Sequence, residues 1–329
     1  MKEYVIRRIL QMLLTIFVLI TICFVLFRLI PGDPAALVVG PTLDPEAQAV
    51  LHKQFGLDQP IHVQYYFYMV NILKGNLGTS FVYRIPIMQI ILERLMNTVV
   101  LMGTGMFFVF IIGVIIGTLL AWKRGSKIDT SGIVLSFAFR AAPIFWIGMI
   151  LLSIFSYTLG WFPIGLMRTP GYDASNLFEK FFDLDFLHHM ALPLICTILY
   201  YVGNPILVMR NSMLEVLGSE FIELAKAKGL KTGQIIFRHA ARNAMLPVIT
   251  LTSIELGYAI GGQVLLETVF SWPGMGRAIV EAVNSSDYPM AQGCFIFLGA
   301  IVITMNFITD LLYLYLDPRI SYSVKGQTE

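Results

Sequence analysis

The sequence predicts an all-α integral membrane protein with six transmembrane helices. Of its 329 residues, 57% are hydrophobic and only 13% are charged, whereas an ordinary soluble domain is about 25% charged. Six apolar stretches are each long enough to cross a bilayer core of roughly 30 Å. A basic segment, 219–247, separates the fourth stretch from the fifth. The six stretches run approximately Ile9–Ile30, Thr98–Trp122, Ile133–Leu159, Met190–Met209, Leu246–Leu266 and Ala291–Leu316.

The first apolar stretch is interpreted as a retained transmembrane helix. Lys2, Arg7 and Arg8 precede it, as charges precede the core of a signal peptide, but the run is too long and no small-residue cleavage site closes it. Positive charges are also dense in the short segment after Trp122 and in 219–247. Because cytoplasmic loops are enriched in Lys and Arg, we expect both termini and these two loops to lie in the cytoplasm.

An external insertion, 31–96, is expected between the first two transmembrane helices. Within 44–56, an Asp-Pro-Glu start and a terminal glycine are typical of a helix. A second helix is predicted over His62–Leu73, because apolar and aromatic residues recur there at helical spacing and a Lys-Gly pair follows. A third is predicted to start at Pro86 and to continue into the second transmembrane helix.

The rest of the chain is expected to form one membrane domain. Two further external loops, Gly160–Leu187 and Ser271–Pro289, contain proline and glycine and are expected to be irregular. The predicted boundaries are 1–30 for the cytoplasmic N-terminus and first helix, 31–96 for the insertion, 97–316 for the five-helix core with a cytoplasmic loop at 211–244, and 317–329 for a cytoplasmic tail.

The cytoplasmic segment 219–247 is predicted to contain a short amphipathic helix. Ser219 stands at the N-cap position and Gly229 at the position of a left-handed stop. Acidic residues lie in the first turn and basic residues in the last, as the helix dipole favours. Phe221 and Leu224 share one side, where they can fill a hydrophobic groove on another protein.

A second helix in this segment is predicted to start near Thr232 and to continue until Pro247 ends or kinks it. Taken alone, the charges of the segment suit an ordinary basic cytoplasmic loop. Only the resemblance carried by the glycine and the residues after it favours a docking loop instead.

These residues resemble a known pattern. Glu-x-Ala-x-x-x-Gly at 223–229, followed by Arg-His-Ala and then Arg-Asn-Ala at 238–244, is similar to the coupling (EAA) loop of ATP-binding-cassette (ABC) importer permeases. The long spacing from the glycine to Leu-Pro at 246–247 resembles the dipeptide, oligopeptide and nickel subfamily. Segments elsewhere agree, so the resemblance covers nearly the whole chain: 7–8, 28–34, 55–60, 76–80, 267–274, 287–289 and 317–319. Two positions depart from the family pattern: Met96 stands where a proline is common, and Arg140 stands where an uncharged residue is usual.

The resemblance implies the type I ABC importer permease fold and a set of coupling residues. Contact with a separate ATPase would involve Glu220, Phe221, Glu223, Leu224, Ala225, Lys228 and Gly229, supported by Arg238, Arg242 and Asn243. The implied partners are a second homologous permease chain, two cytoplasmic ABC ATPase subunits, an extracytoplasmic substrate-binding protein and the lipid bilayer, with no nucleic acid. ATP and magnesium would bind the ATPases, and this chain would hold no cofactor or metal.

Two charges at membrane depth, Arg140 and Glu255, are candidates for the translocation path, with Asp310 nearer the cytoplasmic end. A charge at this depth is costly and normally faces protein or water. Arginine can bind a carboxylate through paired hydrogen bonds, so Arg140 is a candidate to meet a cargo carboxylate. The alternative is that Arg140 and Glu255 pair with each other, or with polar neighbours, for structural reasons.

The expected function is that of a permease subunit forming half of the path for short peptides in a bacterial or archaeal cytoplasmic membrane. Nickel, glutathione and oligosaccharide cargoes remain open within the subfamily. A secondary transporter is the alternative from another class, but it typically has discontinuous helices and repeated halves, and no repeat is visible here. The sequence also lacks the G-x-x-x-x-G-K-[ST] phosphate loop of an ATPase and the motifs of membrane hydrolases.

Overall fold

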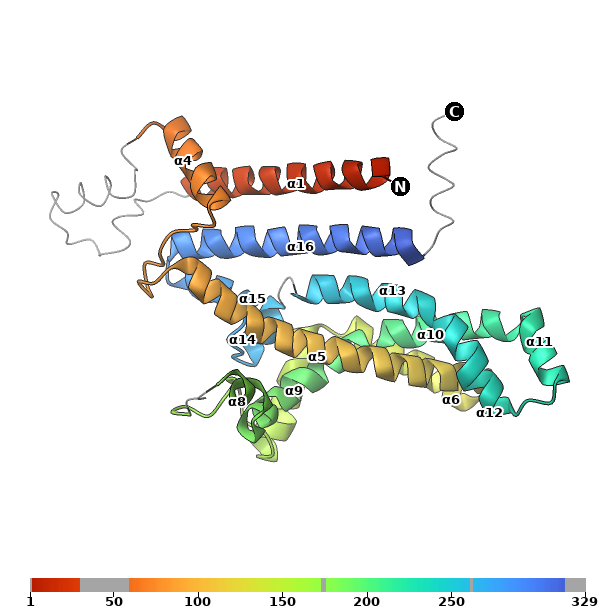
Figure 1. Cartoon of the computed structure of the whole chain (residues 1–329). Coiled ribbons are helices and arrows are strands. Elements are labelled where there is room, and N and C mark those ends of the chain that lie inside the picture. The colour runs from red at the N-terminus through yellow and green to blue at the C-terminus, as the bar shows by residue number, and fades with distance from the viewer. Residues whose placement is uncertain (1, 30–58, 173–175, 261–262, 317–329) are drawn as a thin grey trace.

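The computed structural model describes residues 2–29, 59–172, 176–260 and 263–316, and each named element within these ranges is a helix (Figure 1). The helix predicted over 44–56 lies outside the described residues. The α-helices are α1 (Lys2–Leu29), α4 (Ile61–Leu73), α5 (Ile87–Trp122), α6 (Lys127–Ala141), α7 (Ile144–Leu151), α8 (Leu177–Phe182), α9 (Leu184–Tyr201), α10 (Gly203–Leu217), α11 (Glu220–Ala227), α12 (Thr232–Gln234), α13 (Ala241–Ile260), α14 (Val264–Val269), α15 (Met275–Asn284) and α16 (Tyr288–Leu316). Two π-helical turns accompany them, η1 (Leu152–Thr158) and η2 (Ile235–Ala240).

The predicted all-α membrane fold is confirmed, although one of its spans is broken. Within the described residues, five helical segments are long and apolar enough to cross a membrane, and one bent pair of helices would make a sixth. α4 occupies almost the range predicted for it, and α5 starts directly after Pro86 as predicted. Because α5 is continuous from Ile87, the boundary set between residues 96 and 97 falls inside this helix.

The third predicted span, Ile133–Leu159, consists of two helices rather than one. α6 and α7 are bent by 100° at a short break. Pro143 explains the break, because proline lacks an N–H donor and disfavours the helical conformation of the residue before it. That residue, Ala142, is extended, with φ −74° and ψ 134°. The apolar pattern predicted a single helix here, and that prediction is wrong.

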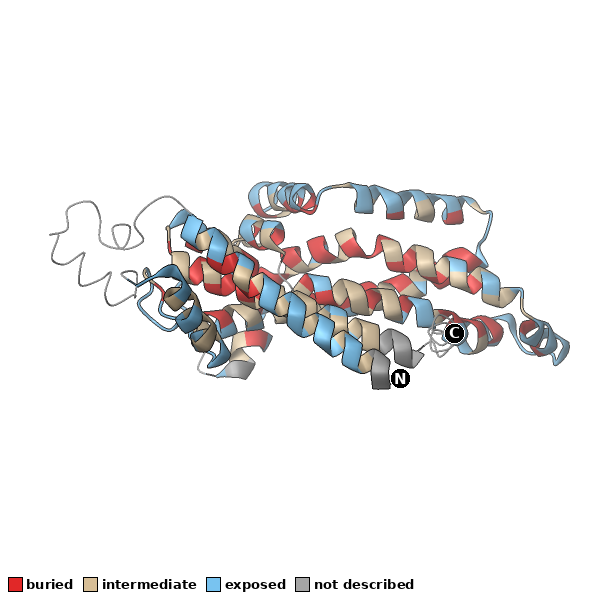
Figure 2. Ribbon diagram, turned by 90° about the horizontal axis from the view of Figure 1, so that it is seen from above, coloured by how far each residue is buried: buried red, intermediate tan, exposed pale blue. Residues whose placement is uncertain are grey.

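The long helices lie side by side (Figure 1). α1 and α16 pack together along one edge of the molecule, and α13 contacts both α16 and α5. Arg8 on α1 and Asp310 on α16 form an ion pair of 3.1 Å, so the Asp310 charge is partnered. Figure 2 shows that the buried residues face neighbouring helices, whereas the outer helix faces are exposed. Many of the exposed residues are large and apolar, as in a protein surrounded by lipid.

The fourth and fifth predicted spans have different ends from those expected. α9 and α10 are separated by Val202, whose own backbone is helical, so the fourth span continues toward segment 219–247. The predicted start near Thr232 is confirmed, and α12, η2 and α13 then run together to Ile260 with Pro247 inside. Pro247 therefore does not end the helix. A proline is tolerated at membrane depth where neighbouring groups satisfy the freed backbone carbonyl.

The two loops that were predicted to be external and irregular both contain helices. Ser271–Pro289 was expected to be irregular but includes α15, and Gly160–Leu187 includes α8. The fully buried Trp272 anchors the first of these loops, because its indole N–H donates to the carbonyl of Asn97 at 3.0 Å. The Asn97 amide donates in return to the carbonyl of Pro273 at 2.8 Å.

Two buried carboxylates join segments that are far apart in the sequence. Glu267, in α14 beyond the membrane-spanning helices, accepts hydrogen bonds from the Thr98 hydroxyl at 2.7 Å and from the Arg277 backbone N–H at 3.0 Å. Burial raises the pKa of the Glu267 carboxyl above its ordinary value. Asp287 accepts a hydrogen bond from the Ser80 hydroxyl, which ties the insertion to the start of α16. The segments 97–98 and 267–274 are therefore spatial neighbours, as are the segments 76–80 and 287–289.

Candidate functional site

The short helix predicted in the cytoplasmic loop is α11, which lies at the far end of the molecule beyond α10 (Figure 1). The backbone of Ser219 is extended, as expected of an N-cap residue. Ser219 is therefore the N-cap residue as predicted, although its hydroxyl donates to the carbonyl of Val216 at 2.5 Å rather than accepting from the helix. Glu220 and Glu223 lie in the first turn and Lys226 in the last, as the helix dipole favours.

α11 has a buried face and an exposed apolar face. Ile222 is 0% exposed and Ala225 is 8% exposed, and both belong to a cluster with residues of α10, η2 and α13. On the adjoining face, the exposed fractions are 43% for Phe221 and 57% for Leu224. The predicted exposed pair is confirmed, while its contact with an ATPase stays a prediction. Neighbouring large apolar side chains at the tip of a protein are suited to a groove on a partner.

Gly229 ends α11 in the left-handed conformation that its position predicted, with φ +75°. Its N–H donates to the carbonyl of Lys226 at 2.9 Å, and the N–H of Leu230 donates to the carbonyl of Ala225 at 3.3 Å. This pair of bonds is the Schellman arrangement, which satisfies the last carbonyls of a helix. A side chain at Gly229 would meet no atom within 4 Å but would strain the backbone. The direction of the chain after α11 therefore depends on glycine.

Support for α11 comes from different residues than those predicted. Arg238 and Arg242 are exposed, and no hydrogen bond or ion pair joins them to another residue in the described part of the chain. Asn243 donates to the carbonyl of His239 at 2.9 Å within its own helix. The surface beneath α11 is made instead by buried apolar residues of the second loop helix. They are Ile235, Ile236, Ala240, Ala241 and Ala244.

The two candidate path residues do not pair with each other in the described structure. Arg140 is exposed at the end of α6, one residue before the break, and donates to the Tyr200 hydroxyl at 2.7 Å. Its guanidinium carbon lies 4.9 Å from the centre of the Tyr200 ring, in a cation–π contact. Asn204 donates to Glu255 at 2.9 Å, and the second Glu255 carboxylate oxygen is buried without a hydrogen-bond partner.

These residues form a polar cluster beside the broken helix, which we call the membrane polar cluster. It draws on α6, α9, α10, α13 and the segment before α14, through Arg140, Tyr200, Tyr201, Asn204, Glu255 and Gln263. Only its two charges were identified from the sequence. Polar side chains within apolar stretches were the signal for the others, because such residues seldom face lipid. The 100° bend between α6 and α7 lies next to this cluster and was not predicted.

Comparison with known proteins bears directly on this arrangement. Residues 113–322 match the family described as binding-protein-dependent transport system inner membrane component. Residues 1–102 match the family that describes the N-terminal part of such membrane components. The chain belongs to this family of inner membrane components. The permease is 37% identical over 335 residues to the dipeptide transport system permease protein DppB of Alkalihalophilus pseudofirmus. This alignment covers 98% of the chain and 100% of the relative.

Two further relatives also align over 98% of this permease and 100% of their own length. The oligopeptide transport system permease protein AppB of Bacillus subtilis is 35% identical over 323 residues. The glutathione transport system permease protein GsiC of Salmonella typhimurium is 34% identical over 322 residues.

These matches confirm the resemblance to ABC importer permeases and the type I fold. The chain is a multi-pass membrane component of a transport system. The break between α6 and α7 removes one argument against a secondary transporter, since such proteins commonly have discontinuous helices. The family match over nearly the whole chain nevertheless assigns the protein to the binding-protein-dependent class.

Proposed function

We propose that this permease forms half of the path by which an ABC importer brings short peptides across the cytoplasmic membrane of a bacterium or archaeon. A second, homologous permease chain forms the other half. Two ATPase subunits dock on the cytoplasmic side and bind all of the ATP and magnesium, while this chain carries out no chemistry and binds no cofactor. An extracytoplasmic binding protein delivers the cargo.

The observation that carries the proposal is the exposed pair Phe221 and Leu224 on α11. Ile222 anchors α11 in a buried cluster with residues of α10 and η2. A force that a bound ATPase exerts on the exposed face of α11 is therefore transmitted to α10 and η2 and not lost in a flexible loop. In Figure 1, α1 begins at the same end of the molecule as α11. The concentration of Lys and Arg at this end supports a cytoplasmic location for both termini and for α11.

The membrane polar cluster supports the placement of Arg140 and Glu255 in the translocation path. Arg140 is exposed on this chain, and a charge at membrane depth does not face lipid without a large cost. Its side of α6 therefore faces water or the second permease chain. The free donors of its guanidinium are suited to a carboxylate of a passing peptide.

Peptide cargo is supported by the names of the dipeptide and oligopeptide permeases among the relatives. Glutathione is the second candidate, because permeases named for glutathione transport are 34% identical over their full length. Uptake assays with the cognate binding protein distinguish them: competition of dialanine uptake by glutathione indicates shared transport, and its absence indicates peptide cargo alone.

The coupling role of α11 is tested by Gly229→Asp, with Gly75→Asp as its matched control. Gly75 has φ +74° and Gly229 has φ +75°, and a Cβ added at either glycine would meet no atom within 4 Å. The two substitutions therefore impose the same backbone strain and charge at different places, one beside α11 and the other after α4.

We expect Gly229→Asp to abolish substrate-stimulated ATP hydrolysis in the reconstituted transporter, and Gly75→Asp to preserve it. ATPase subunits should co-purify with the unmodified permease. Recovery of a lone permease that transports cargo without any ATPase would contradict the proposal and favour a secondary transporter. Equal losses in both variants would show that strain, rather than position, explains the effect.

A further inference from the structure

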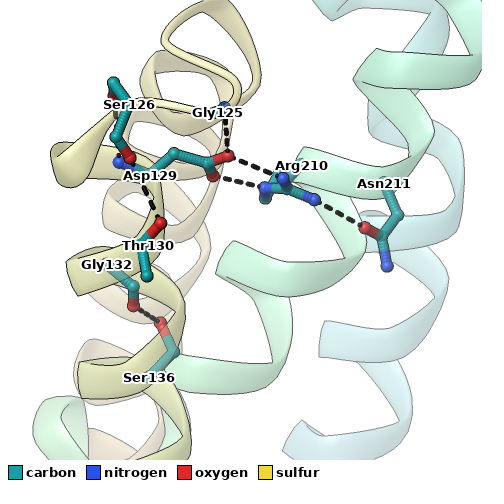
Figure 3. Close-up of polar contacts among 8 residues, drawn as sticks. All are labelled: Gly125, Ser126, Asp129, Thr130, Gly132, Ser136, Arg210 and Asn211. Carbon is teal, nitrogen blue, oxygen red and sulfur yellow. Dashed lines mark hydrogen bonds and ion pairs between the residues drawn. The ribbon is translucent and has the colours of Figure 1, made fainter.

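A buried ion pair joins α6 to α10 close to the cytoplasmic loop (Figure 3). The Arg210 guanidinium donates twice to Asp129, from Nε to Oδ1 at 2.6 Å and from an Nη to Oδ2 at 2.8 Å. The side chain of Asp129 is 4% exposed and that of Arg210 is 15% exposed. The backbone N–H of Gly125 donates to the same carboxylate at 2.9 Å. Neither Arg210 nor Asp129 was singled out from the sequence.

The geometry of the Asp129–Arg210 pair constrains how the two side chains are oriented. A guanidinium that donates two parallel hydrogen bonds to one carboxylate fixes both the distance and the relative orientation of the two side chains. Arg210 also donates to the Asn211 side chain at 3.3 Å, and the Ser126 hydroxyl accepts from the Asp129 backbone N–H at 3.3 Å. Both partners are thus held by neighbouring residues of their own segments, and little freedom remains between the first turn of α6 and the middle of α10.

α10 leads directly into the coupling helix. It ends at Leu217, and α11 begins at Glu220 after only two residues. α10 is also held close to its neighbours by glycine. A Cβ on Gly203 would lie 2.5 Å from the Ser136 carbonyl of α6, and a Cβ on Gly117 of α5 would lie 2.6 Å from the Ile206 carbonyl of α10. α5, α6 and α10 therefore pack as a closely fitted block.

At its other end, α6 is followed by the sharp bend into α7. One residue beyond Arg140 the helix ends, and α7 leaves at 100°. α6 thus has the Asp129–Arg210 pair at its first turn and the membrane polar cluster at its last. A displacement of α10 that is passed through the pair reaches Arg140 through a single helix.

We propose that the Asp129–Arg210 pair is the positioning contact that makes α6 move with α10 when α11 is displaced, and that it thereby links the cytoplasmic loop to the break beside Arg140. The inference rests on the proposed function, because it requires an ATPase that moves α11. Neither residue touches cargo or nucleotide. Their role is to keep two helices in register during a rigid-body change.

The test uses the complete transporter, with permease chains, ATPases and binding protein reconstituted in nanodiscs and dialanine as the cargo. Asp129→Asn removes the charge of one partner, and Arg210→Lys keeps the charge but loses the paired hydrogen bonds. Glu281 pairs with Arg94 at 3.0 Å and with Arg277 at 2.7 Å in another part of the chain, and Glu281→Gln provides the control. Melting temperature, ATPase affinity and ATP hydrolysis with and without loaded binding protein are measured for each.

We expect Arg210→Lys and Asp129→Asn to bind the ATPase with unchanged affinity and to keep basal ATP hydrolysis. Stimulation by loaded binding protein should fall about fivefold or more, which is the low end of typical coupling between linked sites. Glu281→Gln should keep full stimulation. The charge-exchanged double variant Asp129→Arg with Arg210→Asp should recover part of the stimulation that either single change loses.

A second measurement separates positioning from simple stability. Spin labels at Lys127 on α6 and Glu215 on α10 should report one distance with and without ATP in the otherwise unmodified permease, and two distances in Arg210→Lys. Unchanged stimulation in both single variants would overturn the proposal, as would a loss that only follows the melting temperature. Failure of the unmodified permease to retain an ATPase would refute the proposed function instead.

Discussion

The two faces of α11 are expected to separate stability from ATPase docking. The perturbation is a pair of substitutions two residues apart, Ile222→Ala and Leu224→Ala. Ile222 is 0% exposed within the cluster beneath the helix, whereas Leu224 is 57% exposed. Truncation of a buried isoleucine to alanine costs about 2–5 kcal/mol in stability. Truncation of an exposed leucine on a helix changes stability by only about 0.5 kcal/mol in either direction.

The expected loss of ATPase-binding free energy follows from the exposed fraction of Leu224. Complete burial of a leucine side chain contributes about 1.5–3 kcal/mol. Because roughly half of Leu224 remains to be covered by a partner, its truncation should remove about 1 kcal/mol of docking free energy, which weakens ATPase binding about fivefold. Ile222 is already covered within this chain, so its effect on binding should come only through the fraction of α11 that stays folded.

The assay combines thermal melting of the purified permease with titration of the ATPase onto permease in nanodiscs. We expect Leu224→Ala to melt like the unmodified protein and to bind the ATPase about fivefold more weakly. Ile222→Ala should melt at a distinctly lower temperature. If Leu224→Ala binds the ATPase with full affinity while α11 remains helical, the assignment of its exposed face to docking is refuted.

Three further outcomes are expected. Arg140→Gln should lower peptide uptake at unchanged assembly, because the carboxylate-binding guanidinium at the break is lost; uptake that matches the unmodified transporter would contradict its place in the path. Gly117→Ala should lower the melting temperature by an amount equivalent to about 1–3 kcal/mol, since the added Cβ would lie 2.6 Å from the Ile206 carbonyl; Gly103→Ala, with no atom within 4 Å, is the control. Burial raises the pKa of Glu267, so the folded state binds its proton more tightly than the unfolded state does. This contribution to stability should be complete below the ordinary carboxyl pKa and lost as the pH rises through the folded pKa. Melting curves of Glu267→Gln across that pH range should lack this decline, and a decline equal to that of the unmodified permease would refute the assignment.

The candidate site was largely predictable where it depends on local sequence. Gly229 in the left-handed region, the acidic first turn of α11 and the outward pair Phe221 and Leu224 all follow from preferences within a single helix. The supporting residues were not predictable in the same way. Arg238 and Arg242 attracted notice because they are charged, but α11 rests on apolar residues of the same two helical segments, η2 and α13.

The buried polar contacts show the same division. Asp129 and Arg210 are separated by 81 positions, so no local pattern indicates that they meet. Glu267 and Thr98 are separated by 169 positions. Within the sequence, each of these residues resembles an ordinary polar side chain at a helix end or in a loop. Only the packing of the surrounding helices excludes water, and a buried polar side chain then needs a hydrogen-bond partner from the protein.

By itself, the sequence determined the membrane class, the approximate positions of the apolar segments and the pattern of charged and apolar residues on α11. These depend on composition, on the length of a run relative to the bilayer and on preferences that act within about one helical turn. Only the tertiary structure decided where α6 breaks from α7, that Arg140 contacts Tyr200 rather than Glu255, and that α6 is tied to α10. The reason is physical: each of these contacts depends on how two helices are placed relative to each other, and the sequence of one helix alone does not determine that placement.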